Sequence, residues 1–178
     1  MKKICALFAV LIFGISISAQ KLTTGPVPTS QPTFAAVDMA GQKVDIAALK
    51  GKVVVLNLWF VNCPNCLEEI KLLNGLVDQY KDNKDVVFVG LAASKKVNLQ
   101  QFLQKNPFKY QIIPDATQII LGKFGDPNKS GEVDVPFPMH YVLDRQGNIV
   151  VKAQGIKGVD VVKKELVTQF TKKAGGSN

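Results

Sequence analysis

Apolar and polar residues follow patterns that divide the chain into strands and helices. Val53–Trp59 and Val86–Ala92 are apolar at nearly every position, which is typical of strands in the middle of a sheet covered on both faces. Between these two runs, apolar residues recur at helical spacing from Leu67 to Tyr80. A strand, a helix and a second strand in this order favour a parallel sheet with a crossover helix.

The helix between the two strands is predicted to have a polar face. This face carries Glu68, Glu69, Lys71 and Asp78, and Gly75 lowers the helix propensity. Both glutamates lie near the start of the helix, where its positive end favours a carboxylate. We therefore expect Glu68 and Glu69 to be solvated.

Shorter elements are predicted in the rest of the chain. They are an N-terminal β-hairpin over residues 34–39 and 44–46, a short turn capped by Asp45, a helix over 98–106 capped by Asn98, a strand over 110–113, a helix over 117–124, a surface loop over 125–131, two strands over 139–143 and 149–154, and a last helix over 159–172. The last two strands are antiparallel because only a short connection joins them. We therefore predict one α/β domain with a central mixed β-sheet, helices on both faces and an added N-terminal β-hairpin.

The N-terminus has the features of an export signal. Lys2 and Lys3 precede an apolar stretch over residues 4–17, and small residues follow it. The stretch is shorter than the roughly 20 residues of an ordinary membrane-spanning helix, although retention as an anchor is an open alternative. We predict a signal peptide over residues 1–19 that is cleaved near residues 18–20, a tether over 20–31, the folded domain over 32–173 and a frayed tail over 174–178. Cys5 would leave with the signal.

The charge of the chain does not indicate a nucleic-acid partner. The formal net charge is +8, but the lysines are scattered apart from short doublets such as residues 163–164. Nucleic-acid binding needs a clustered basic patch, often interleaved with aromatic residues. We therefore expect solvated lysines with weak attraction to acidic partners.

The candidate chemistry lies at Cys63 and Cys66, which follow the first buried strand and begin the next helix. Unpaired N–H groups and the dipole at a helix N-terminus favour a thiolate over a thiol. An exported protein also meets conditions in which disulfides persist. A static structural disulfide is the alternative, but a bridge over so short a loop gains little chain entropy. The pair therefore indicates thiol-disulfide exchange.

Several separated segments resemble the thioredoxin-like superfamily, and within it the exported TlpA/ResA-type thiol-disulfide oxidoreductases of bacterial envelopes. They are the entry into the redox strand over residues 48–59, the Cys63-Pro64-Asn65-Cys66 motif, the acidic Glu69 three residues after it, the segment over 137–144 that contains Phe137 and Pro138, and the bend over 155–158. The resemblance covers about residues 32–170 and implies a thioredoxin-like fold.

The resemblance also implies roles for individual residues. Cys63 would be the nucleophile and Cys66 the resolving cysteine, and no cofactor is expected beyond their redox-active disulfide. Pro138 would be a cis-proline opposite the dithiol. The substrate groove would be formed by Pro138, Phe137, Trp59, Pro64 and Asn65. From the residues alone, Pro138 also fits a strand start, whereas Phe137 and Trp59 also fit core positions.

The chain departs from the family near the dithiol. Asn62 stands where many members have a tryptophan, and Asn57 takes the place of the buried acid of cytoplasmic thioredoxins. Some ResA-type proteins carry a glutamate after the second long strand, but residues 90–94 contain no acid. The sequence therefore offers no obvious buried carboxylate to accept the proton of Cys66.

These features predict an exported thiol-disulfide oxidoreductase that reduces protein disulfides in the periplasm or cell envelope. We expect a monomer that receives electrons from a membrane-bound or other thiol donor, and the resembled family suggests cytochrome c maturation as one use. A thiol peroxidase is an alternative, but its Pro-x-x-x-Thr/Ser-x-x-Cys arrangement is missing. The other alternative is a metal-binding or metallochaperone module that uses Cys63, Cys66 and His140. The oxidoreductase hypothesis requires no metal.

Overall fold

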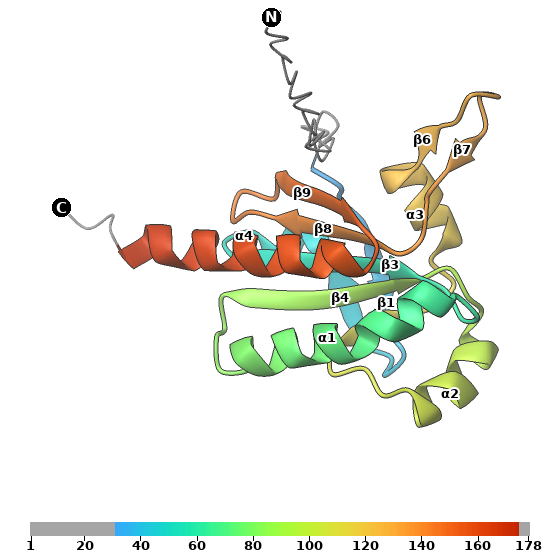
Figure 1. Cartoon of the computed structure of the whole chain (residues 1–178), viewed down its shortest axis with the longest axis horizontal. Helices are drawn as coiled ribbons and strands as arrows, with labels where there is room; N and C mark the ends of the chain where they lie inside the picture. Colours follow the sequence, from blue (N-terminus) through green and yellow to red (C-terminus); the bar gives the residue numbers. More distant parts are fainter. Residues whose placement is uncertain (1–30, 175–178) are drawn as a thin grey trace, which may run out of the picture.

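The computed structural model describes residues 31–174 of the chain (Figure 1). Its strands are β1 (Ala35–Val37), β2 (Lys43–Asp45), β3 (Val53–Trp59), β4 (Val86–Ala92), β5 (Gln111–Ile113), β6 (Asp126–Pro127), β7 (Val133–Asp134), β8 (Met139–Leu143) and β9 (Ile149–Gln154). Its helices are the short η1 (Ile46–Leu49), α1 (Pro64–Tyr80), α2 (Lys96–Lys105), α3 (Thr117–Phe124) and α4 (Ile156–Ala174). The predicted signal peptide, nearly all of the tether and nearly all of the tail lie outside the described residues, so these boundaries stay predictions.

Five strands form the central sheet in the order β5-β4-β3-β8-β9. β3 pairs in parallel with β4, and β4 pairs in parallel with β5. β8 and β9 extend the other side of β3 as antiparallel strands. β1 and β2 form a separate antiparallel hairpin, as the sequence predicts. The mixed sheet and the added hairpin agree with the predicted fold class.

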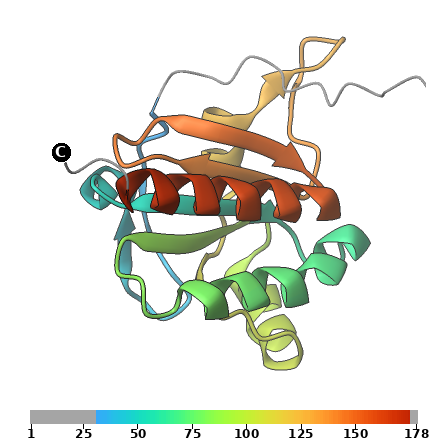
Figure 2. The ribbon, with the colours of Figure 1, turned by 60° about the vertical axis from the view of Figure 1, so that its left-hand side comes forward.

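β3 is buried along its whole length because both faces of the sheet are covered. On one face, Val53 and Val55 pack with buried residues of α1 and α4, which lie side by side in Figure 2. On the other face, Leu56 and Leu58 pack with α3 and the N-terminal hairpin. A third apolar cluster, at the end of β3, joins Trp59 to both cysteines and to residues of α2.

Two helices begin earlier than the sequence predicts. α2 starts at Lys96 rather than Asn98, and the side chain of its cap residue Lys95 makes no capping hydrogen bond. α4 starts at Ile156 because Gly155, with φ of 69°, forms the bend by itself. Residue 158 therefore lies inside the helix.

Part of the predicted surface loop is paired. β6 and β7 form a two-stranded ribbon that projects from the body beside α3 (Figure 1). The Oδ1 atom of Asn128 accepts hydrogen bonds from the backbone N–H groups of Ser130 and Glu132, each at 3.0 Å. At the base of the ribbon, Asp126 forms an ion pair with Lys152 of β9. These contacts explain why a segment with loop composition forms a short hairpin.

No described helix is long and apolar enough to cross a membrane.

Candidate active site

Cys63 lies at the junction between β3 and α1. Asn62, just before it, has φ of 69°, a left-handed conformation that asparagine adopts more readily than most residues. Cys63 is the N-cap of α1, and Pro64 begins the helix, where its missing N–H leaves no hydrogen bond unmade. The backbone N–H of Cys66 is directed at the Cys63 Sγ atom at 3.2 Å. The first sulfur therefore lies where a helix terminus stabilises a thiolate.

Cys63 and Cys66 are joined by a disulfide, with their Cα atoms 5.2 Å apart. In this oxidised state Cys63 is 4% exposed and Cys66 is 2% exposed. Pro64 and Asn65, between them, are exposed. A partner that approaches this site therefore meets the two intervening residues before it reaches the sulfurs.

Trp59 packs in the interior next to the disulfide. Trp59 is 1% exposed, and its ring stacks on that of Phe108 with the ring centroids 4.6 Å apart. Trp59 belongs to the same apolar cluster as both cysteines. Almost none of the ring is accessible to a partner in this oxidised state, which favours the core position for Trp59, and its place in the substrate groove stays a prediction.

The start of β8 lies beside the end of β3, which leads into Cys63. β8 runs antiparallel to β3 with Met139 opposite Leu58, so the residues just before β8 neighbour the end of β3. The Phe137–Pro138 peptide bond is cis. The Phe137 ring meets the Phe60 ring edge-on, with centroids 5.3 Å apart. This placement is compatible with a groove wall at Phe137 and Pro138, which stays a prediction.

Four polar side chains form a cluster inside the protein, which we call the polar cluster: Asn57, Glu69, Tyr110 and His140. Asn57 is 3%, Glu69 1% and His140 0% exposed. The Asn57 Nδ2 atom donates to Glu69 Oε1 at 3.0 Å and lies 3.5 Å from His140 Nδ1. The Tyr110 hydroxyl donates to Asn57 Oδ1 at 3.2 Å. The His140 Nε2 atom lies 3.1 Å from Glu69 Oε2.

The polar cluster lies between the dithiol and the aliphatic core. Asn57 is opposite His140 of β8, and it precedes Trp59 by two residues on the same face of β3. Glu69 follows Cys66 by three residues, so the two side chains are neighbours along one face of α1. The cluster therefore places a carboxylate one helical turn from Cys66.

The expectation that Glu69 is solvated is wrong. Glu68 is exposed as predicted, but Glu69 shares the buried face of α1 with Cys66, Leu73 and Leu76. These four buried positions are separated by steps of three and four residues, which is the spacing of one helix face. This spacing was the available signal in the sequence. The chain therefore does contain a buried carboxylate close to Cys66.

The environment of Tyr110 is apolar and negatively charged. Burial raises the pKa of the Tyr110 hydroxyl well above its ordinary value, and the nearby charge of Glu69 adds to the rise. The phenol therefore stays protonated and remains a donor to Asn57.

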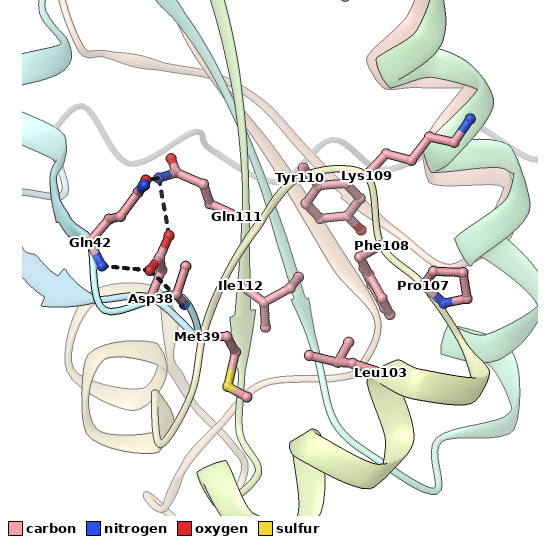
Figure 3. Close-up of a pocket in the computed structure, with 11 residues that line it drawn as sticks. Asp38, Met39, Gln42, Leu103, Pro107, Phe108, Lys109, Tyr110, Gln111 and Ile112 are labelled. Atoms are coloured by element: carbon pink, nitrogen blue, oxygen red, sulfur yellow. Dashed lines mark hydrogen bonds between the residues drawn. The ribbon is translucent and has the colours of Figure 1, made fainter.

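The ring of Tyr110 also lines a hollow at the β5 edge of the sheet (Figure 3). The hollow has a volume of about 570 Å³ and lies between the β1–β2 turn, the end of α2 and residues 107–112. Met39 and Ile112 contribute apolar surface, whereas Asp38 accepts a hydrogen bond from the side chain of Gln111 at 3.2 Å. Neither cysteine lines this hollow, so it is separate from the dithiol.

The geometry gives no support to the metal-binding alternative. Within residues 31–174, no group of three His, Cys, Asp or Glu side chains is placed to hold a metal ion. His140 contacts Glu69 and Asn57, so it does not complete a ligand set with the two cysteines.

The fold and the helix-terminal dithiol define a thioredoxin-like thiol-disulfide oxidoreductase. The chain belongs to the AhpC/TSA family, which matches residues 27–152. It is 30% identical to the thiol-disulfide oxidoreductase ResA of Bacillus thuringiensis over 125 residues, which cover 70% of this chain and 67% of that protein. This relative identifies the ResA type within the family.

Solved structures share the fold. The thioredoxin domain of a thiol-disulfide oxidoreductase from Bacteroides vulgatus has a TM-score of 0.62 at 23% identity, and the match covers 81% of this chain and 98% of that chain. A thiol:disulfide interchange protein of the thioredoxin family from Chlorobium tepidum has a TM-score of 0.61 at 24% identity, covering 75% of this chain and 95% of that chain. The predicted thioredoxin-like fold is confirmed.

Proposed function

We propose that the protein is an exported thiol-disulfide reductase that acts on protein disulfides through Cys63 and Cys66. The observation that carries this proposal is the Cys63 sulfur at the N-cap of α1, with the N–H of Cys66 directed at it. A sulfur in this position is favoured as a thiolate and therefore as a nucleophile. The similarity to ResA supports the same chemistry.

The first step uses the dithiol form of the protein. The Cys63 thiolate attacks one sulfur of a partner disulfide and forms a mixed disulfide with it. The partner's own S–S bond breaks, and its other sulfur leaves with the electron pair and takes up a proton. Pro64, Asn65, Phe137 and Pro138 are the residues that we expect the partner to contact.

The second step releases the partner. The Cys66 thiol loses its proton, and its sulfur attacks the Cys63 Sγ atom, which breaks the bond between Cys63 and the partner. Burial disfavours a free thiolate, so a proton acceptor inside the protein is needed. Glu69 is the buried carboxylate that neighbours Cys66 on α1. The net result is a partner reduced to two thiols and a Cys63–Cys66 disulfide.

The cellular setting of this reaction is inferred from the sequence and its resemblance. The N-terminal pattern supports export to the periplasm or cell envelope. A membrane-bound or other thiol donor would return two electrons to the disulfide. The resembled family supports an apocytochrome cysteine pair as one substrate, and the chain would act as a monomer.

The test is reduction of a small disulfide-bonded protein with dithiothreitol as the electron source. We expect Cys63→Ser to lose all catalysed reduction. Cys66→Ser keeps the nucleophile, so it is expected to accumulate the mixed disulfide, detectable by mass spectrometry. Full activity of Cys63→Ser would contradict the mechanism.

A further inference from the structure

The hydrogen bonds of the polar cluster determine which nitrogen of His140 carries a proton. The Nδ2 atom of Asn57 is an amide nitrogen and can only donate, and it faces His140 Nδ1 at 3.5 Å. His140 Nδ1 is therefore the acceptor, and the proton is on Nε2. This N–H is directed at Glu69 Oε2 at 3.1 Å.

The orientation of the Asn57 amide is itself fixed by two neighbours. Its Oδ1 atom accepts from Tyr110 at 3.2 Å, and its Nδ2 atom donates to Glu69 at 3.0 Å. The reverse orientation would place the amide oxygen against the Glu69 carboxylate, where neither atom can donate. Each oxygen of Glu69 thus receives one donor, from Asn57 and from His140.

We propose that His140 is a positioning residue for the second step of the exchange reaction. It holds the Glu69 carboxylate through Nε2, so that Glu69 is ready to accept the proton of Cys66. This inference rests on the proposed reductase function. It assigns a role to a histidine that lies 71 positions from Glu69 in the sequence.

The hydrogen-bond pattern also keeps the transferred proton on Glu69. A second proton on His140 would have to go to Nδ1, which faces the amide donor of Asn57. Two donors would then oppose each other inside the protein, which is unfavourable. His140 therefore keeps Nε2 as its donor to Glu69.

The transfer can be followed atom by atom. The S–H proton of Cys66 moves to an oxygen of Glu69, and the Cys66 sulfur forms its bond to Cys63 Sγ. The bond between Cys63 and the partner breaks, and the partner sulfur leaves with the electron pair as a thiolate. The proton on Glu69 then passes to water, which restores the carboxylate. The buried negative charge of Glu69 is thus neutralised while the sulfurs react.

The described neighbours of the imidazole come from several elements. α1 contributes Glu69, and Tyr110 approaches through Asn57. β9 places Ala153 opposite His140, and α4 places Gly158 against the ring. Ala153 and Gly158 therefore bring no further charge next to the imidazole.

The experiment measures the second step in stopped-flow single turnovers of the reduced protein with oxidised glutathione. Trp59 is the single tryptophan and belongs to the dithiol cluster, so its fluorescence reports disulfide formation. Positioned proton acceptors contribute about 10²–10⁴-fold to rate, so we expect Glu69→Gln to slow resolution by about 100-fold and His140→Met by about tenfold. The mixed disulfide should accumulate in both variants, and acid quenching followed by mass spectrometry detects it.

Three comparisons separate positioning from a structural role. Glu68→Gln, the exposed neighbour on the same helix, should resolve as fast as the wild type. His140→Gln keeps an N–H donor and should recover part of the rate lost in His140→Met. The pH profile of resolution should move to higher pH in Glu69→Gln and His140→Met, because solvent must then take the Cys66 proton.

A measurement on the unmodified protein avoids any dependence on variant folding. His140 is the single histidine, so its ring ¹⁵N signals in protein without a histidine tag need no assignment. We expect the Nε2–H tautomer at neutral pH in both redox states. An unchanged resolution rate in His140→Met, or the Nδ1–H tautomer, would overturn the proposal, and an unchanged rate in Glu69→Gln would remove its premise. Loss of mixed-disulfide formation in the wild type would instead contradict the proposed function.

Discussion

Gly158 of α4 lies directly against the imidazole of His140 in β8. A Cβ atom built on Gly158 would come within 2.7 Å of His140 Cδ2 and within 3.3 Å of the Ala153 backbone. The absence of a side chain at this position is therefore what allows α4 to close over the polar cluster. α4 and β8 are consequently coupled through a histidine that is fully buried.

We predict that Gly158→Ala destabilises the protein although alanine is the better helix former. Overpacking a buried position typically costs about 1–3 kcal/mol, which exceeds the helix-propensity gain of roughly 1 kcal/mol. Urea unfolding measures the change in the free energy of unfolding. Resolution of the mixed disulfide should slow as well, because His140 must move.

Gly75 of α1 provides the matched control for this substitution. It is also helical, but a Cβ atom built on it meets nothing within 4 Å. Gly75→Ala should therefore stabilise the protein by about 0.4–1 kcal/mol. Equal effects of the two substitutions would show that the contact with His140 is not what matters.

Tyr110→Phe tests the outer part of the polar cluster. The substitution removes the donor to Asn57 Oδ1 and leaves that buried oxygen without this hydrogen bond. We expect a loss of about 1 kcal/mol in the free energy of unfolding. Tyr80→Phe is the control, since the Tyr80 ring packs on Phe170 and its hydroxyl has no hydrogen-bond partner among residues 31–174. A larger loss in the Tyr80 variant would contradict this account.

The elements that carry the dithiol could be predicted from the sequence because they depend on local patterns. The continuous apolar run of β3 and the helical spacing after Cys66 both extend over neighbouring residues. The start of α2 was harder, because Asn98 has the right chemistry for a cap but lies within the helix. The helix begins at Lys96, two residues before Asn98.

The polar cluster could not be predicted in the same way. Glu69 and His140 meet only because β8 pairs with β3 in the register that places residue 140 opposite Asn57. No local pattern relates positions 71 residues apart. The helix spacing from Cys66 to Leu76 does place Glu69 on the buried face. An acidic side chain near a helix start is usually solvated, however, so burial was not expected.

The tyrosines predict a loss of stability at alkaline pH. Burial raises the pKa of Tyr80, Tyr110 and Tyr141, with the charges of Glu69 and Asp126 adding to the rise for the latter two. The unfolded chain loses these protons near pH 10, while the folded chain retains them. The stabilisation is therefore fully present below about pH 10 and is lost as the pH rises through the folded pKa values.

Urea unfolding between pH 8 and pH 11 measures this dependence. Absorbance of ionised tyrosine should show little change in the folded protein until unfolding begins. Tyr110→Phe should lose less stability over the same pH interval than the wild type. A free energy of unfolding that rises above pH 10 would contradict the predicted sign.

The contact between Phe60 and Phe137 leads to a prediction about substrate size. The two rings meet at 5.3 Å, one from the residue after β3 and the other from the residue before Pro138. We expect Phe137→Ala to raise KM for a protein disulfide several-fold, because the partner loses apolar contact surface. Oxidised glutathione is too small to use that surface, so the rate of its reduction should change little.

Phe34→Ala is the control, because it truncates a half-buried ring that packs on Phe124. It should leave the rates with both substrates unchanged. Equal losses for the two substrates would place Phe137 in the core alone.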